Sequence, residues 1–118
     1  MKAILEEKYW ADRLFSDIVR KRGVCELPAN EYCLKNKSLE TAHILSRSYY
    51  PIRWSLDNAL CLCHNCHFFY TNHNKKWKED IKRKIGVDKY QELQNRGNTY
   101  QKIDYGKIMS DLRMVFYE

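Results

Sequence analysis

The sequence predicts a small α+β domain, in which two short strands and a helix form a core flanked by helices at both ends. Three observations lead to this prediction. Apolar residues recur at helical spacing near both termini, and two apolar runs in the middle are short enough for strands. Four cysteines suit one metal ion. The chain of 118 residues is long enough for one ordinary domain but not for two.

The first segment, residues 1–24, is expected to be a helix. Within residues 3–22, apolar side chains recur at helical spacing, namely Ala11, Leu14, Phe15, Ile18 and Val19. Basic residues fill the last turn, where cations interact favourably with the helix dipole. Gly23 is a suitable residue for ending the helix.

The middle segment, residues 25–85, is expected to form the core. It divides into a loop, a strand, a turn with a second strand, and a helix with a break, at residues 24–40, 41–46, 57–63 and 67–85. The side chain of Asn74 is suited to capping the helix after the break. In the last segment, residues 86–118, a short helix over 87–96 precedes a final helix that Asp104 caps.

Composition and charge limit the function classes. No apolar run approaches the roughly 18 residues of a membrane span, and the N-terminus has no long apolar segment typical of a secretory signal. The formal net charge is +6, and the five cysteines are an odd number. A small basic chain of this kind favours metal binding over a disulfide framework, and nucleic acid as the partner. We expect a cytoplasmic protein that does not bind membranes.

Four of the cysteines predict one structural Zn²⁺ site. Cys63 and Cys66 have the two-residue gap that lets both sulfurs reach one ion, and Cys25 and Cys33 are the available partners, although their gap is longer than usual. Two alternatives remain open: buried cysteines without a metal, and a redox centre, which lacks the βαβ surroundings typical of that motif. Cys61 is expected to point the same way as Cys63 in a regular strand and to pack or remain a spare thiol.

A histidine and asparagine pattern surrounds these cysteines. The chain reads Ala-His-Ile-x-x-Arg over residues 42–47 and has Arg53-Trp54 before Asn58. From Asn58 it reads Asn-x-x-x-Leu-Cys-x-x-Cys-His, which ends at His67. Over about residues 25–73 the sequence resembles phage-type HNH endonucleases, whose fold is the ββα-metal fold.

The resemblance implies roles for individual residues. His43 corresponds to the general base that activates water, Asn58 to the residue that orients the base, and His67 to a ligand of one catalytic divalent metal. This metal would be Mg²⁺ or Mn²⁺, with Zn²⁺ or Ni²⁺ as alternatives. Many family members have a metal ligand immediately before the base, where this chain has Ala42. We therefore expect His73 to be the second ligand, which requires a break in the helix near residues 71–72.

Basic residues surround the predicted site. Arg47 is a candidate for holding the scissile phosphate, and Arg53 is either a DNA contact or a structural link to the core. Four lysines are candidate phosphate contacts on the helix after the break: Lys75, Lys76, Lys78 and Lys82. The alternative for the lysines is an ordinary solvated helix face.

The leading hypothesis from the sequence is a metal-dependent DNA endonuclease that nicks its substrate. A double-strand break would require two active sites, as a homodimer would supply. The resemblance to phage-type sequences suggests a partner in phage packaging or recombination. The resemblance implies a bacterial or phage-infected cell as the setting. The second hypothesis is a catalytically inactive, zinc-stabilised DNA-binding module, which Ala42 favours. A redox or zinc-storage protein would leave the histidine and asparagine pattern unexplained.

Overall fold

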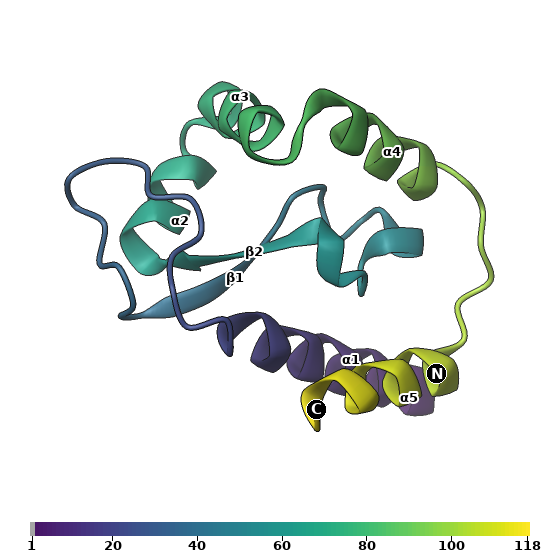
Figure 1. The fold of residues 1–118 in the computed structure, drawn as a ribbon. Coiled ribbons are helices and arrows are strands. Elements are labelled where there is room, and N and C mark those ends of the chain that lie inside the picture. Colours follow the sequence, from purple (N-terminus) through teal and green to yellow (C-terminus); the bar gives the residue numbers. More distant parts are fainter. Residues whose placement is uncertain (1) are drawn as a thin grey trace.

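The computed structural model describes the backbone of residues 2–118 and the side chains from residue 6 onward. Within this range the chain forms a two-stranded antiparallel sheet and five α-helices (Figure 1). The strands are β1 (Leu39–His43) and β2 (Ala59–Cys63); the helices are α1 (Lys2–Arg20), α2 (His64–Thr71), α3 (Asn74–Ile85), α4 (Val87–Gly97) and α5 (Tyr105–Phe116). The predicted α+β class is confirmed. Among the described helices, none has the length and apolar character needed to cross a membrane.

The sheet lies between two helical layers, with α1 and α5 on one side and α3 and α4 on the other (Figure 1). Strand β2 is buried along its whole length, and its side chains alternate between the layers. Ala59 and Cys61 pack with α1 and α5, whereas Leu60 and Leu62 pack with the residues of α2, α3 and α4. The two-residue period of a strand thus divides the core into two apolar clusters.

Strand β1 begins and ends earlier than the predicted strand over residues 41–46. It covers Leu39–His43, and its last residue is paired with Ala59. Beyond the pairing, the Ile44 N–H donates to the Asn58 carbonyl at 2.8 Å, and the chain leaves the sheet. The loop back to β2 contains two short 3₁₀ helices, η1 (Tyr50–Ile52) and η2 (Leu56–Asn58).

The helix predicted over residues 67–85 is indeed broken, into α2 and α3. Helix α2 begins at His64, earlier than predicted, because the Cys63 sulfur accepts the Cys66 N–H at 3.4 Å and caps the first turn. The predicted cap of α3 at Asn74 is wrong: the capping position is His73, which makes no side-chain capping bond. The predicted cap of α5 is confirmed, since the Asp104 carboxylate accepts the Lys107 N–H at 3.1 Å.

Asn58 closes the loop between the two strands. Its side chain is fully buried, and its amide oxygen accepts the Leu45 N–H at 2.9 Å. Its amide nitrogen donates to the carbonyls of Leu45 and Ile52, at 3.1 and 3.3 Å. One side chain therefore satisfies three backbone groups of the loop that are shielded from water, and it fixes the path of the chain on either side of η1.

We predict that Asn58→Ala lowers the free energy of unfolding by roughly 2 kcal/mol or more, because at least one buried backbone group is left without a partner. Urea unfolding of the metal-loaded protein measures this change. Asn95→Ala is the matched control, since Asn95 is exposed on α4. Equal stability of the two variants would contradict the structural role of Asn58.

Candidate functional site

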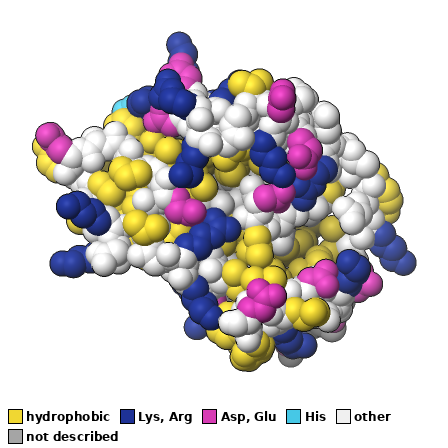
Figure 2. All heavy atoms as spheres, viewed as in Figure 1, with side chains coloured by type: hydrophobic (Ala, Val, Ile, Leu, Met, Phe, Trp, Pro, Cys, Tyr) yellow, Lys and Arg dark blue, Asp and Glu magenta, His cyan; other side chains and the backbone are white. Residues whose placement is uncertain are grey.

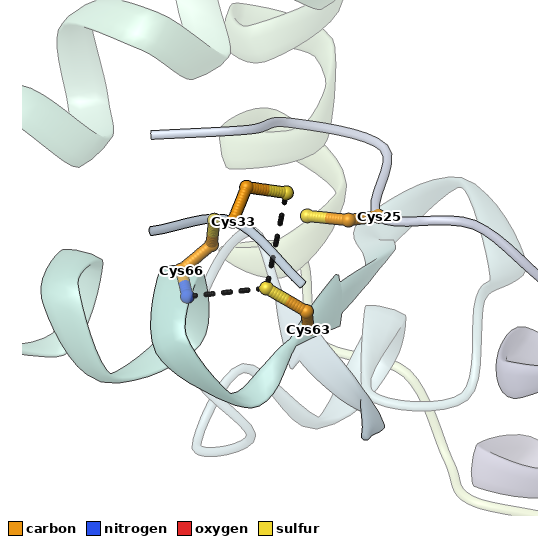
Figure 3. Close-up of side chains that lie close together, drawn as sticks. All are labelled: Cys25, Cys33, Cys63 and Cys66. Atoms are coloured by element: carbon orange, nitrogen blue, oxygen red, sulfur yellow. Dashed lines mark hydrogen bonds between the residues drawn. The ribbon is translucent and has the colours of Figure 1, made fainter. Parts of the chain in front are cut away.

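Four cysteine side chains converge from two distant parts of the chain (Figure 3). Cys25 and Cys33 lie in the loop between α1 and β1, and Cys63 and Cys66 lie at the junction of β2 and α2. All four sulfur atoms lie within 4.8 Å of one another, and those of Cys33 and Cys63 are 4.0 Å apart. The four thiols are therefore positioned to hold one metal ion.

Backbone N–H groups surround these sulfur atoms. The N–H groups of Leu34 and Ala29 donate to the sulfurs of Cys63 and Cys66, each at 3.3 Å. Burial opposes ionisation of Cys63, but hydrogen bonds from backbone N–H groups and from the neighbouring thiols outweigh it and lower the pKa of this thiol to about 7. Burial raises the pKa of the Cys66 thiol. Since metals bind thiolates, this cluster would release protons on binding an ion.

Cys61 is not part of the cluster. Its side chain is fully buried on the α1 side of the sheet, whereas Cys63 lies with the other core cluster. The expectation that the two side chains point the same way is wrong, because Cys63 ends the strand and already caps α2. The interpretation of Cys61 as a packing residue is consistent with its place against Phe15 and Val19 in the apolar cluster.

A second site is a hollow of about 180 Å³ between the end of β1 and the helices α2 and α3. Two of the predicted histidines, His43 and His67, line it together. The other lining residues are Ala42, Tyr70, Thr71, Asn74 and Trp77. The structure therefore brings together the predicted base and the predicted metal ligand, which are 24 residues apart in the sequence.

His43 is held through one ring nitrogen. Its Nε2 lies 3.0 Å from the Arg53 carbonyl oxygen, which only accepts, so Nε2 carries the proton and Nδ1 keeps its lone pair. The ring also stacks on Phe15 of α1, with the ring centres 5.2 Å apart. Burial lowers the pKa of His43, with help from the charges of Arg47 and Arg53, and the hydrogen bond to the carbonyl only partly offsets this. At neutral pH the ring is therefore an uncharged proton acceptor.

Asn58 bonds to backbone and not to the ring of the predicted base. Asn58 bonds to the backbone of Leu45 and Ile52, and the latter directly precedes the residue whose carbonyl holds His43. The side chain of Asn58 therefore fixes the loop, and the loop fixes the ring.

His67 is also held through one ring nitrogen. Its Nδ1 lies 2.8 Å from a carboxylate oxygen of Glu40, which faces α2 from β1. The other oxygen of Glu40 lies 2.8 Å from Nδ1 of His64. Burial raises the pKa of Glu40, but the hydrogen bonds from the two histidines outweigh it and leave this pKa below its usual value. The Nε2 atom of His67 is the ring nitrogen left for a ligand.

His73 does not join His67 in the hollow. Helix α2 ends at Thr71, and α3 begins at Asn74, so the break places Asn74 at the hollow instead. The His73 ring turns back onto Phe69, with ring centres 4.0 Å apart, and its Nδ1 bonds to the Phe69 carbonyl at 2.7 Å. The expectation that the break would bring the two histidines together is not met.

The two predicted arginine contacts differ in their surroundings. Arg53 is buried, and its guanidinium donates to both carboxylate oxygens of Asp12 on α1, at 3.0 and 2.7 Å. It also lies over the rings of Tyr50 and Trp54. These contacts support the structural alternative for Arg53 and leave its charge no free access to a phosphate. Arg47 is exposed, so its role as a phosphate contact stays a prediction.

The four predicted lysines are all exposed on α3, and Figure 2 shows basic side chains around that end of the molecule with acidic ones among them. Lys75, Lys78 and Lys82 share one helix face, at spacings of three and four residues. Lys76 differs, because its amine bonds to the buried carboxylate of Asp80 at 2.8 Å. Three lysines are thus the better candidates for phosphate contact.

Glu40 and Asp12 were not predicted from the sequence. Glu40 precedes His43 by three residues, and the alternation of β1 puts it on the same face as Ala42, next to α2. The alternation of side chains along β1 could have predicted the position of Glu40, but only if the bounds of the strand had been known. Asp12 lies in a helix far from the motif, and no local pattern links it to Arg53.

No family model, no curated protein and no solved structure matches this chain.

We predict that Cys33→Ser strongly reduces the metal bound by the purified protein, because it removes one of the four converging sulfurs. Elemental analysis should find about one ion per wild-type chain and much less in the variant. Cys61→Ala is the control, since it removes a buried thiol outside the cluster and should retain the ion. Equal metal content in wild type and Cys33→Ser would contradict a four-cysteine site.

Proposed function

We propose that this chain is a metal-dependent DNA endonuclease of the HNH type. The observation that carries the proposal is the pair of histidines in one hollow. His43 and His67 each have one ring nitrogen bound to an acceptor, which leaves the other nitrogen with a lone pair. Proton abstraction and metal ligation are the two tasks that such nitrogens perform in phosphodiester hydrolysis.

The proposed role of His43 is that of general base. Its Nδ1 accepts a proton from the water that attacks the phosphate, while the Arg53 carbonyl keeps the ring oriented through Nε2. Among the described residues, Asp12 is the carboxylate that acts electrostatically on the His43 ring, and it is bonded to Arg53. Hydrolysis would leave a 5′-phosphate and a 3′-hydroxyl, as the resemblance to HNH enzymes implies.

His67 is the proposed principal ligand of the divalent ion. A bound ion would supply stabilisation of negative charge on the phosphate and on the leaving oxygen. Mg²⁺ or Mn²⁺ would keep several waters at a site with so few protein ligands, whereas an imidazole ligand is more typical of the alternatives Zn²⁺ and Ni²⁺. Thr71 and Asn74 line the hollow beside His67. Their side-chain oxygen atoms are the proposed additional ligands of the ion. They replace His73 in this proposal.

The four-cysteine cluster is proposed to hold a structural Zn²⁺. A tetrahedral ion with four thiolates at about 2.3 Å separates the sulfurs by about 3.8 Å, close to the 4.0 Å between Cys33 and Cys63. All four positions are protein ligands, so the ion has no open position for catalysis. DNA would contact Arg47 and the face of α3 with Lys75, Lys78 and Lys82, which favours binding without sequence readout.

We predict that the purified protein nicks supercoiled plasmid in the presence of Mg²⁺ or Mn²⁺, and that EDTA abolishes the nicking. His43→Ala should reduce the rate by about 10²–10⁴-fold, the usual contribution of a general base. Conversion of supercoiled to open-circular DNA on a gel measures both effects. Asn95→Ala on the exposed surface of α4 is the control. Equal nicking by wild type and His43→Ala would refute the assignment of the base.

The alternative function is an inactive, zinc-stabilised DNA-binding module. Ala42 favours it, because this residue lines the hollow and offers no ligand atom where many HNH nucleases have one. The variant Ala42→Asp separates the two functions. If wild type shifts DNA on a gel but never nicks it, and Ala42→Asp gains metal-dependent nicking, the inactive module is the correct description. If wild type already nicks, the missing ligand only weakens the site.

The lowered pKa of His43 gives a pH dependence. A base works only while it is neutral, and a pKa below the ordinary value of about 6.5 keeps it neutral to lower pH. We predict that kcat/KM for nicking stays high at pH 6.5 and falls only at lower pH. Arg47→Gln removes a positive charge that lowers this pKa, so the fall should move to higher pH. A fall that lies above pH 6.5 in the wild type would contradict a buried base.

A further inference from the structure

The half-buried side chain of Glu40 joins two histidines of α2. Its two carboxylate oxygens each lie 2.8 Å from a different ring nitrogen, Nδ1 of His64 and Nδ1 of His67. The two histidines are three residues apart and therefore lie on the same face of the helix. His64 also stacks on the ring of Phe68, one turn further along, with ring centres 6.5 Å apart. Neither Glu40 nor His64 has a role in the hydrolysis described above.

A carboxylate accepts hydrogen bonds and cannot donate them. The Nδ1 atom of His67 must therefore carry the proton, and Nε2 must keep its lone pair. A neutral histidine without such a partner prefers the opposite tautomer, with the proton on Nε2. In that tautomer the nitrogen next to the hollow could not bind a cation. The contact with Glu40 thus decides whether His67 is ready to act as a ligand.

His64 occupies the other oxygen of the same carboxylate. A glutamate side chain has three rotatable bonds, and a single hydrogen bond leaves the carboxylate free to turn. With both oxygens engaged from one helix face, the carboxylate plane is fixed relative to α2. His64 therefore acts on His67 through Glu40, and its effect should be smaller than that of Glu40.

A direct metal site at these three side chains is the competing explanation. Both Nδ1 atoms point at oxygens of Glu40, and each hydrogen bond has ordinary length. Among the described residues, the four cysteines are the one group of three or more potential ligands close enough together to hold an ion, and Glu40 with the two histidines is not such a group. The contacts of Glu40 are therefore interpreted as hydrogen bonds.

We propose that Glu40 and His64 are positioning residues, which hold His67 in the tautomer that presents Nε2 to a divalent cation. The role of that cation in catalysis rests on the proposed nuclease function. The tautomer of His67 does not depend on it, so the nuclease proposal and the positioning proposal can fail separately. Metal-ligating histidines in proteins are commonly oriented by a carboxylate in this way, and loss of the carboxylate typically costs about 10–100-fold in metal affinity.

The first test is the tautomer of His67 in ¹⁵N-histidine-labelled, zinc-loaded protein without other divalent ions. Long-range ¹H–¹⁵N spectra at about pH 8.5, where histidines are ordinarily neutral, assign the protonated nitrogen. Wild type and the control Glu79→Gln should show the proton on Nδ1 of His67. Glu40→Ala should shift the population toward Nε2. An unchanged Nδ1 tautomer in Glu40→Ala would overturn the proposal.

The second test is Mn²⁺ affinity, measured from the free ion by electron paramagnetic resonance. Glu40→Ala should weaken binding by about 10–100-fold, His64→Ala should weaken it less, and Glu79→Gln should leave it unchanged. Nicking by Glu40→Ala should recover when Mn²⁺ is raised, whereas a folding defect would not be rescued. Wild-type affinity in Glu40→Ala would overturn the positioning role. If wild type shows the Nδ1 tautomer but binds no Mn²⁺, the nuclease proposal fails and the orientation by Glu40 stands.

Discussion

The convergence of four thiols at the junction of β2 and α2 is the constraint on which the rest of the structure depends. A two-stranded sheet is marginal by itself in water, and the loop over residues 24–38 has no regular secondary structure to hold it. The cluster ties this loop to the end of β2 and to the first turn of α2. Because Cys63 and Cys66 fix the first turn, they also fix the direction of the next side chain, His67. A structural ion and a ligand for a catalytic ion would thus share one helical turn.

The other histidine depends on a separate set of contacts. His43 ends β1, and its ring is oriented by a carbonyl in the loop that returns to β2. Two sets of contacts hold that loop in place. The buried amide of Asn58 bonds to the loop backbone, and Arg53 of the loop pairs with Asp12 of α1. Helix α1 therefore contributes to the site in two ways, through the bond of Asp12 to the loop and through Phe15, which stacks on the His43 ring. The N-terminal helix thus supports the loop that orients His43.

Much of this could be predicted from the sequence, and the failures have physical causes. The cysteine pairs and the break in the helix were predicted from short-range spacing, whereas the shared site of His43 and His67 was predicted from the resemblance to HNH endonucleases. The bounds of β1 were missed because Asn58 draws Ile44 and Leu45 out of the sheet, an effect of tertiary hydrogen bonding. His73 was assigned to the metal because the break in the helix was predicted without its direction. The two alternatives for Arg53, a DNA contact and a structural link, could not be decided from the sequence because its partner, Asp12, is 41 residues away.

The two histidines of the hollow are oriented in the same way, and this orientation helps to distinguish an enzyme from a binding module. Each ring is bonded through one nitrogen to a group that only accepts, the Arg53 carbonyl or the Glu40 carboxylate. The orientation therefore leaves a lone pair on the other nitrogen in both rings. A module that only binds DNA gains nothing from two such lone pairs, since phosphate recognition requires donors. Ala42 stands where many HNH nucleases have a metal ligand, but both histidine nitrogens are still present. The expected consequence is that a higher metal concentration is required, while the proposed base is retained.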